Sequence, residues 1–472
     1  MLQNFFKSIS YQHKAPLDPD FIPAHKFAVA YQDLTETEPS VELHFSLQRS
    51  PEQVLRFSLK VVDSEKYHDL TTLYLQRTIK FHLWSTGGYE LKVAGSSKWG
   101  KILKDIFSET GPERFDALFM KRIYDQSFSV KAVEVSQLPP AQEQMRSIGG
   151  HLDGNRIGFD LGASDYKIAA VKNGEAVFTT EIRWDPVPQT DPNYHWKRIL
   201  DGIELAASYL PSVDAIGGSS AGIINNNRIM VASLFRSVPL ETFSREVTPI
   251  FENLQKKWNV PLIAINDGDV SALAGAMGLK EAGILGVAMG SSEAVGFINK
   301  EGKITGQLNE LAFAPIDYNP QGAMDEWSQG VGVGVMYFSQ QAVNRLALAA
   351  GWSFAEDMLL PERLKEVQEK ANAGDEKALK IYETIGVYLG YTVPYYHQFY
   401  DFNKLMAFGR VMSGKGGDVI IETALSVLKS EYPELLDQIE LCVPDEKFRR
   451  VGQAVAAASL PTINPGKVHG LS

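Results

Sequence analysis

The sequence Ile-Ala-Ile-Asn-Asp-Gly-Asp at residues 263–269 places polar residues between an apolar run and a run of small residues. The apolar run predicts a buried strand over 261–265, and the small residues predict a helix over 270–277. An amide such as Asn266 can hydrogen-bond a hydroxyl group in both directions. The neighbouring Asp267 can take the proton of that hydroxyl as it attacks a phosphoryl group. Taken alone, the stretch favours a structural alternative, in which Asn266 forms a turn and Asp267 or Asp269 caps the helix.

Three further stretches place glycines and polar residues at the ends of predicted strands. They read Gly-Phe-Asp-Leu-Gly-Ala-Ser at 158–164, Ala-Met-Gly-Ser-Ser-Glu-Ala-Val-Gly at 288–296 and Ala-Phe-Gly-Arg-Val-Met-Ser-Gly at 407–414. In the first stretch, Asp160 can hold a metal ion or its water, and Gly162 lets backbone N–H groups approach a phosphate. An ordinary tight turn is the alternative interpretation of the stretches at 158–164 and 288–296.

Strands and helices are predicted to alternate from about residue 155 onward, which indicates α/β layers. The predicted strands span 155–159, 164–172, 214–217, 261–265, 284–288, 294–299 and 404–408. The predicted helices span 196–210, 240–258, 270–277, 362–390 with an interruption at Gly374, and 418–428.

The first 150 residues have a different pattern, typical of an α+β domain. Strands are predicted at 26–31, 40–48, 54–62, 88–93 and 127–133, and helices only at 98–107 and 112–124. We expect the aromatic residues of this region to lie in its core; they are Tyr67, Tyr74, Phe81, Trp84 and Tyr89. The proline- and glycine-containing stretch 137–154 is typical of a linker. We therefore predict an N-terminal domain at 1–150 and a core at 155–465.

Composition excludes several classes of protein. The 472 residues carry a net charge of -11, and an acidic surface repels phosphate backbones, so we expect no nucleic-acid partner. The single cysteine, Cys442, excludes a zinc site built from several cysteines. Neither a signal peptide nor a membrane span is recognisable. We expect a cytoplasmic protein with no membrane partner.

The order and spacing of the four stretches resemble the ROK family of sugar kinases (repressors, open reading frames, kinases). Further similar pieces lie at 214–223, 309–311, 322–330 and 450–457. The resemblance covers roughly 155–465. It implies an α/β, two-lobed actin/hexokinase-like (ribonuclease-H-like) core with a cleft, to which the N-terminal α+β domain is added.

The resemblance also implies roles for individual residues. Asp267 matches the general base, and Asp160 faces magnesium-bound phosphates without binding the metal directly. Residues on the sugar side are Asn266, Ser220, Gly222, Glu310 and Asp325. Residues around the ATP are Gly162, Ser164, Gly290, Ser291, Ser292 and, against the adenosine, Gly409. ATP and Mg²⁺ are the expected cofactors.

Some positions depart from the family pattern. Phe313 stands where the family has a histidine that contacts sugar and zinc, and the zinc cysteines are absent, so we expect no zinc. Asp165 and Tyr166 lengthen the first hairpin. At 290–294 the family turn Gly-Thr-Gly-x-Gly is replaced by Gly-Ser-Ser-Glu-Ala. A glutamate facing the γ-phosphate opposes binding unless a metal intervenes, and one that points away has no such effect.

The sequence therefore leaves two possible functions open. The first is an ATP-dependent kinase that phosphorylates a hydroxyl of a hexose or hexose derivative, with Asp267 as general base. The second is a non-catalytic protein that binds a sugar or nucleotide and acts on a partner protein through its N-terminal domain. That domain shows no basic recognition helix. A homodimer is the commonest expectation for oligomeric state.

Overall fold

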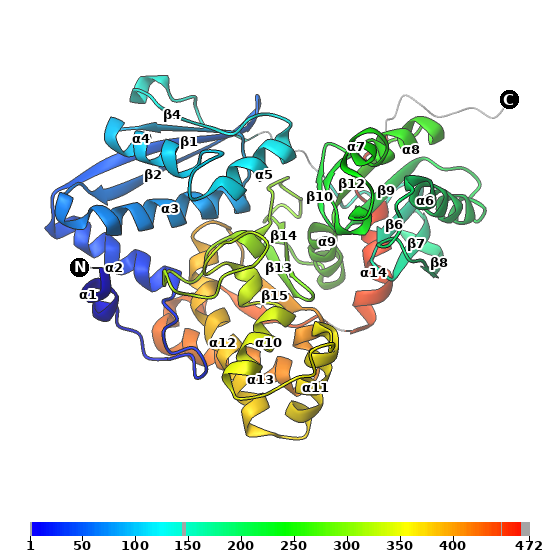
Figure 1. Cartoon of the computed structure of the whole chain (residues 1–472). Coiled ribbons are helices and arrows are strands. Elements are labelled where there is room, and N and C mark those ends of the chain that lie inside the picture. The colour runs from blue at the N-terminus through cyan, green and yellow to red at the C-terminus, as the bar shows by residue number, and fades with distance from the viewer. Residues whose placement is uncertain (1, 144–147, 445, 464–472) are drawn as a thin grey trace. The chain divides into compact units, whose positions relative to one another are not determined.

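The computed structural model describes residues 2–143, 148–444 and 446–463, and it divides into two compact units (Figure 1). Unit 1 comprises Met1–Met145, Val287–Val295 and Gln307–Val443, and unit 2 comprises Arg146–Gly286, Gly296–Gly306 and Pro444–Ser472. The N-terminal residues thus belong to the same unit as 307–443. The separate domain at 1–150 and the core at 155–465 remain predictions. Residues 144–147 of the predicted linker, and 464 and 465 of the predicted core, lie outside the described residues.

Unit 2 is built on a five-stranded sheet of order β12-β9-β6-β7-β8. Strands β6, β9 and β12 run parallel, and β7 and β8 continue from β6 as antiparallel hairpins. The strands are β6 Asn155–Leu161, β7 Asp165–Lys172, β8 Glu175–Arg183, β9 Ala215–Ser220 and β12 Leu262–Asn266. A small hairpin adds β10 Ile223–Asn225 and β11 Arg228–Val231. Strands β6 and β9 are buried almost throughout, as expected for central parallel strands covered on both faces.

Helices cover the sheet of unit 2. They are α6 Pro192–Ala207, α7 Leu240–Thr242, α8 Ile250–Trp258, α9 Asp267–Leu279 and α14 Glu446–Ala458. Helix α14 packs directly on β6 and β9, because glycines leave room for its backbone. A Cβ atom at Gly158 would lie 1.7 Å from the Ala454 carbonyl oxygen, and one at Gly217 would lie 1.7 Å from that of Ala457.

The N-terminal part of unit 1 is a five-stranded sheet of order β4-β3-β1-β2-β5 with helices packed against it (Figure 1). Its strands are β1 Ser40–Ser50, β2 Gln53–Val62, β3 Glu90–Ala94, β4 Ser129–Ala132 and β5 Gln142–Glu143. Its helices are α1 Leu2–Ser8, α2 Ala24–Thr37, α3 His68–Ser85, α4 Ser97–Ile106 and α5 Arg114–Tyr124. Of the aromatic residues predicted for this core, Tyr74, Phe81 and Trp84 are buried, and Tyr67 and Tyr89 are half-buried.

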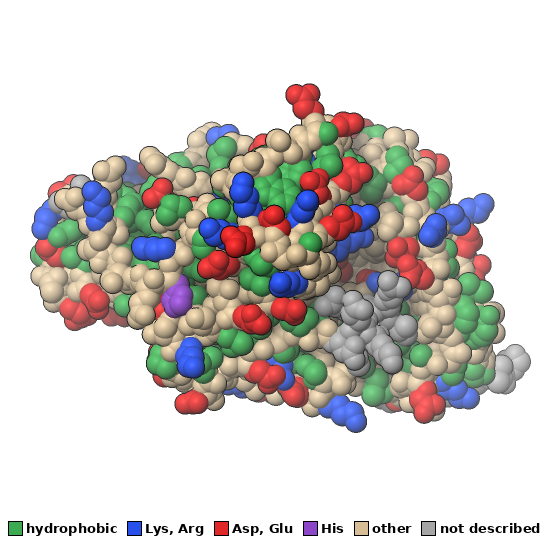
Figure 2. Space-filling view, turned by 90° about the horizontal axis from the view of Figure 1, so that it is seen from below, with side chains coloured by type: hydrophobic (Ala, Val, Ile, Leu, Met, Phe, Trp, Pro, Cys, Tyr) green, Lys and Arg blue, Asp and Glu red, His purple; other side chains and the backbone are tan. Residues whose placement is uncertain are grey.

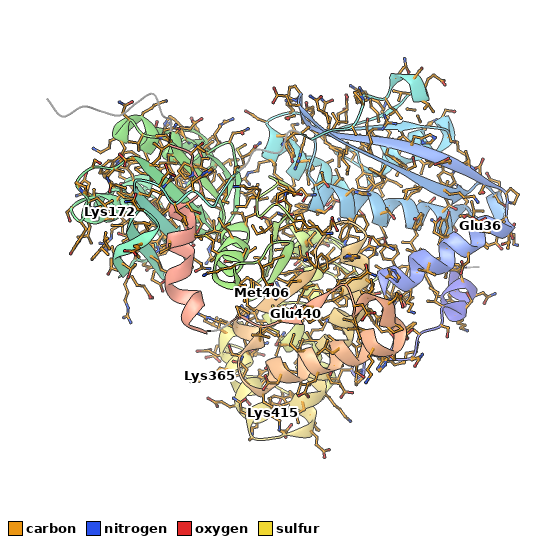
Figure 3. All side chains as sticks on the ribbon, turned by 180° about the vertical axis from the view of Figure 1, so that it is seen from behind. Glu36, Lys172, Lys365, Met406, Lys415 and Glu440 are labelled. Carbon is orange, nitrogen blue, oxygen red and sulfur yellow. The ribbon has the colours of Figure 1, made fainter. Side chains whose placement is uncertain are left out.

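The remainder of unit 1 contains helices and part of a four-stranded sheet of order β14-β13-β15-β16. The strands are β13 Ile284–Met289, β14 Glu293–Ile298, β15 Lys404–Phe408 and β16 Glu440–Cys442. The helices are α10 Gln340–Ala349, α11 Leu360–Asn372, α12 Glu376–His397 and α13 Lys415–Glu431. Figure 3 labels Met406 on β15 and Glu440 on β16, two neighbouring parallel strands. Lys404 and Glu440, which are paired in register, also form an ion pair of 3.0 Å.

Three predictions of secondary structure were wrong. Residues 26–31, predicted as a strand, lie in helix α2, and helix α3 was not predicted at all. The single helix predicted over 240–258 is broken into α7, a π-helical turn at Phe243–Val247 and α8. Pro249 precedes α8 and has no N–H group for a continuous helix, which accounts for that break.

The surface in Figure 2 carries interspersed basic and acidic side chains. No helix among the described residues is both long and apolar enough to cross a lipid bilayer.

Candidate active site

The carboxyl ends of the parallel strands in unit 2 bring together most of the polar residues that the sequence singled out there. Asp160 on β6 lies in register with Ser219 on β9, and the next residue of β9, Ser220, lies in register with Asn266 on β12. Asp267 follows as the first residue of α9. In open α/β sheets, ligands commonly bind at this edge, where loops leave the strand ends.

Asp160 is only 6% exposed, and its two carboxylate oxygens have different partners. The Ser219 hydroxyl donates to Oδ1, and the Lys167 ammonium group lies 2.9 Å from Oδ2. Lys167 also donates to Gln453 Oε1 at 2.7 Å, and so ties β7 to α14. Sequence reasoning singled out neither Lys167 nor Gln453. The feature of the sequence that could have drawn attention to this pair is Lys167, the single basic residue in the interior of an otherwise apolar strand.

Asp267 has an altered acidity. Burial, and to a lesser extent the nearby Asp160 carboxylate, raise the pKa of Asp267 to about 6, while Lys167 acts in the opposite direction. A carboxylate with a pKa near 6 is ionised at neutral pH and is still basic enough to accept a proton. The environment of Asp267 is therefore suited to general-base catalysis.

Asn266 is the N-terminal cap of α9. Its Oδ1 accepts a hydrogen bond from Gly268 N at 2.6 Å, and its Nδ2 donates to the Gly222 carbonyl oxygen at 2.8 Å. This confirms the structural alternative for Asn266 in part, although neither aspartate is the cap. Asp269 instead accepts a hydrogen bond from Phe297 N at 3.2 Å. Binding of a substrate hydroxyl by Asn266 remains a prediction.

The loop from β6 to β7 forms a tight turn. Gly162 N donates to the Asp165 carbonyl oxygen at 3.0 Å, and the exposed Ser164 donates from its hydroxyl to the Asp165 carboxylate at 2.9 Å. The two additional residues of this hairpin, Asp165 and Tyr166, are the first residues of β7. The ring of Tyr166 is buried, and its hydroxyl donates to the Arg198 carbonyl oxygen at 2.8 Å.

In unit 1, the turn between β13 and β14 and the end of β15 bring four predicted nucleotide residues close together. Gly290 N donates to the Ser292 carbonyl oxygen at 3.0 Å, and the side chains of Ser291 and Ser292 are exposed. Gly409 follows β15 with a φ of 102°, and a Cβ atom there would lie 2.5 Å from the Met289 carbonyl oxygen. Only glycine fits this close approach to the end of β13.

Glu293, the acidic residue of the turn at 290–294, is directed into the interior of unit 1. Its side chain is 3% exposed; Oε1 accepts a hydrogen bond from the Tyr396 hydroxyl at 3.1 Å, and Oε2 has no hydrogen-bond partner among the described residues. Burial and, to a smaller extent, the nearby Glu310 raise the pKa of Glu293 to about 8, although the Tyr396 hydrogen bond acts in the opposite direction. Sequence reasoning treated Glu293 only as a change of charge at the turn, because burial cannot be read from one glycine-rich loop.

Glu310 and Asp325, the two predicted sugar-side carboxylates of unit 1, differ in how they are used. Asp325 is 5% exposed, and its Oδ2 accepts hydrogen bonds from Ser328 N at 2.8 Å and from the Ser328 hydroxyl at 2.6 Å, which closes a turn. Glu310 is half-buried, and its backbone N–H donates to the Trp84 carbonyl oxygen at 2.9 Å. Sequence reasoning placed Trp84 in the N-terminal core and did not connect it with Glu310.

No family model and no curated protein sequence matches the chain. Solved structures do match it in fold. A ROK-family transcriptional regulator, described as a homologue of the E. coli MLC protein, is 17% identical, with a TM-score of 0.53 over 66% of this chain and 78% of the regulator. A ROK hexokinase from Thermus thermophilus is 16% identical, with a TM-score of 0.50 over 64% of this chain and 97% of the hexokinase. The chain therefore has the α/β, actin/hexokinase-like fold of the ROK-family proteins.

Proposed function

We propose that the protein is an ATP-dependent sugar kinase that transfers the γ-phosphoryl group to a hydroxyl of a hexose or hexose derivative. The observation that carries this proposal is the environment of Asp267. A carboxylate whose pKa is raised to about 6 stands at the carboxyl edge of a parallel sheet, beside a second carboxylate. The fold shared with a ROK hexokinase supports the same conclusion.

Asp267 acts as the general base in this proposal. As the sugar hydroxyl attacks, its oxygen forms a bond to the γ-phosphorus while the bond between that phosphorus and the bridging oxygen of ADP breaks. The hydroxyl proton passes to the Asp267 carboxylate and then to solvent. The position of Asp267 at the start of α9 holds the carboxylate in place, because Asn266 anchors that helix terminus with its own side chain.

Magnesium, the expected cofactor of such a transfer, fits the residues present. Asp160 offers a hard carboxylate oxygen at a strand end, the type of ligand that magnesium and its water shell prefer. When bound, the ion neutralises charge on the transferring phosphoryl group. Lys167 and Ser219 hold the Asp160 carboxylate in one orientation from two sides. Gly162, Ser164 and the turn Gly290–Ser292 are proposed to contact the phosphates, and Gly409 the adenosine.

On the sugar side, Glu310, Asp325, Ser220 and Gly222 are proposed to line the substrate site together with Asn266. Of the two carboxylates, we favour Glu310 as the one that accepts from a sugar hydroxyl, because the two differ in exposure. Its exposure is intermediate, whereas Asp325 is buried.

A second function has specific support. In the turn at 290–294, Ser292 and Ala294 stand where the family has glycines and Glu293 adds a charge, and the ROK regulator that shares the fold is not described as a kinase. The alternative is a non-catalytic protein that binds a sugar or a nucleotide and acts on a partner through its N-terminal residues. The main reason to prefer this alternative is that a glutamate facing the γ-phosphate would oppose ATP binding. The Glu293 side chain instead points into the interior of unit 1, which weakens that reason.

A coupled assay of ADP release distinguishes the two functions. The assay uses ATP and Mg²⁺ with a panel of hexoses, N-acetylhexosamines and polyols. We expect one member of the panel to support turnover, and Asp267→Asn to abolish it. If no member of the panel supports ADP release while calorimetry demonstrates ADP binding, the kinase function is excluded and the non-catalytic binding function remains.

A further inference from the structure

The segment 308–331 of unit 1 carries both Glu310 and Asp325 but has almost no regular structure. Its described elements are a single 3-10 turn at Leu311–Phe313 and isolated bridges. Backbone N–H and C=O groups that are not paired within a helix or sheet must find partners elsewhere. The partners of this segment therefore determine where Glu310 and Asp325 lie.

The carboxyl end of α3 supplies the first set of partners. The last carbonyl groups of a helix accept no hydrogen bond from within that helix. Here three of them accept hydrogen bonds from consecutive N–H groups of the segment: Leu308 to Thr86 at 3.3 Å, Asn309 to Ser85 at 3.0 Å and Glu310 to Trp84 at 2.9 Å. The end of α3 thus sets the backbone position of Glu310 itself.

The residues before α2 supply a second set, further along the segment. An antiparallel bridge pairs Pro23 with Asp317, and Arg77 of α3 donates to the Val331 carbonyl oxygen. Two backbone hydrogen bonds flank the bridge: Ala24 N to the Ile316 carbonyl oxygen at 3.0 Å and Tyr318 N to the Ile22 carbonyl oxygen at 2.9 Å. The segment is therefore held by N-terminal residues at its start, middle and end. Figure 1 shows it in yellow-green beside α3.

Aromatic side chains make the third connection. The ring of Phe313 lies 4.6 Å from that of Trp84 on α3 and 5.4 Å from that of Trp327. Trp327, which is 60% exposed, also packs edge-to-face on Phe115 and Phe119 of α5, at 5.5 Å from each. These five rings connect α3 and α5 with the two parts of segment 308–331 that carry Glu310 and Asp325. We call them the aromatic cluster.

A buried charged network holds the two helices of the aromatic cluster together. Lys80 of α3 pairs with Asp116 of α5 at 2.9 Å and with Glu113 at 2.7 Å. The indole N–H of Trp84 donates to Asp116 at 3.1 Å. Trp84 therefore makes three kinds of contact at once: its carbonyl oxygen holds Glu310, its ring packs on Phe313, and its indole nitrogen is fixed by α5.

We propose, building on the sugar-kinase function above, that the N-terminal residues 20–124 are the structural support of the sugar-binding segment and that Trp84 is the positioning residue for Glu310. In this role the aromatic cluster organises segment 308–331 through packing and helix-end hydrogen bonds. Loosening α3 then weakens sugar binding, whereas ADP binding is retained.

The test compares Trp84→Ala with Trp99→Ala in the full-length protein. Trp99 is an equally buried tryptophan of the N-terminal sheet region, and it stacks on His68 instead of on the segment. Hydrogen exchange is followed at the amides of 308–313 without ligand. We expect Trp84→Ala to speed exchange there by about tenfold and Trp99→Ala to leave it near the wild-type rate. Equal exchange in the two variants would overturn the proposal.

Kinetics then separate positioning from simple loss of structure. For whichever sugar of the panel supports turnover, Trp84→Ala is expected to raise the sugar KM by about tenfold with the ATP KM within about twofold of wild type. Trp84→Phe, which keeps a ring against Phe313, restores most of the sugar affinity. A parallel rise in both KM values contradicts the positioning role. If no sugar supports turnover, the kinase proposal fails, and the exchange experiment still decides whether the N-terminal residues hold the segment.

Discussion

In unit 2, Asp160 and Asp267 lie where two parallel strands of one mixed sheet end, whereas in unit 1 Glu310 lies in a segment with almost no regular structure. The unit 2 carboxylates are positioned by the ladder of their own sheet and by near neighbours such as Lys167 and Ser219. Glu310 is positioned by the carbonyl oxygen of Trp84, more than two hundred residues earlier in the chain.

This difference shows two ways of holding an acidic group. An acidic residue at a strand end is positioned mainly by the sheet itself, so a short sequence pattern is enough to recognise it. An irregular segment needs partners from elsewhere, so its sequence pattern says little about its position.

Removing the proposed base should have the largest effect. We expect Asp267→Asn to lower kcat by about 10³-fold, because the amide cannot accept the proton. The folded-state pKa of Asp267 is raised to about 6, so its charged form is disfavoured by folding at pH 8. The variant should therefore melt at the same temperature as wild type or higher at that pH. The measurements are ADP release and thermal melting.

Asp269→Asn is the matched control for this variant. Asp269 lies two residues along the same helix and accepts a hydrogen bond from Phe297 N, which an asparagine oxygen can also accept. Its kcat should stay within about threefold of wild type. Equal loss of activity in both variants would show that the helix start, and not the Asp267 carboxylate, is required.

Breaking the charged network under the aromatic cluster should cause the largest loss of stability. Lys80→Met leaves Asp116 and Glu113 buried without their cation, so we expect the free energy of unfolding to fall by about 3 kcal/mol. Urea unfolding provides the measurement. Lys98→Met removes an exposed lysine that pairs with Glu65 at 2.9 Å, and it should hardly move the midpoint. A similar midpoint for the two variants contradicts the supporting role of the network.

Replacing the buried glutamate should stabilise the protein in a pH-dependent way. The folded-state pKa of Glu293 is about 8, above its ordinary value of 4.5, so the folded protein binds more protons and wild-type stability falls as pH rises between these values. Glu293→Gln escapes this loss. We expect it to be more stable than wild type by about 4 kcal/mol at pH 8 and by less than about 1 kcal/mol at pH 5.

Thermal melts at both pH values measure this difference. Glu301→Gln, at an exposed position, is the control and should show no pH-dependent gain. A Glu293→Gln advantage that is independent of pH would mean that Glu293 is ionised in the folded protein throughout this range.

The smallest expected effect is on the pH profile of the reaction. Because Asp267 must be ionised, kcat/KM should fall as pH drops through about 6. Asp160 raises the pKa of Asp267 and Lys167 lowers it, so Asp160→Asn should move this limb to lower pH and Lys167→Met to higher pH. We expect each displacement to be about half a pH unit. Displacements in the same direction would contradict the assignment of the limb to Asp267.

The sequence predicted the parallel strands β6, β9 and β12 of unit 2, because a buried parallel strand is a continuous apolar run whatever its neighbours are, but it missed β8, β10 and β11. It failed on α3, which buries residues all around its axis, among them Thr71, Arg77 and Lys80. A helix without a polar face has no 3.6-residue periodicity to recognise. The run 26–31 was misread because six residues do not distinguish a strand from part of a 14-residue helix.

By itself, the sequence determined that Asp160, Asn266 and Asp267 lie at the ends of predicted strands, and the structure brings those ends to one edge of a sheet. Only the tertiary structure decided that Glu293 turns inward to Tyr396, that Lys167 pairs with Asp160, and that Trp84 holds Glu310. The physical reason is the range of the interactions. A strand end is specified by local apolar burial and backbone geometry, whereas a buried charge or an irregular backbone is specified by partners that the chain brings back from far away.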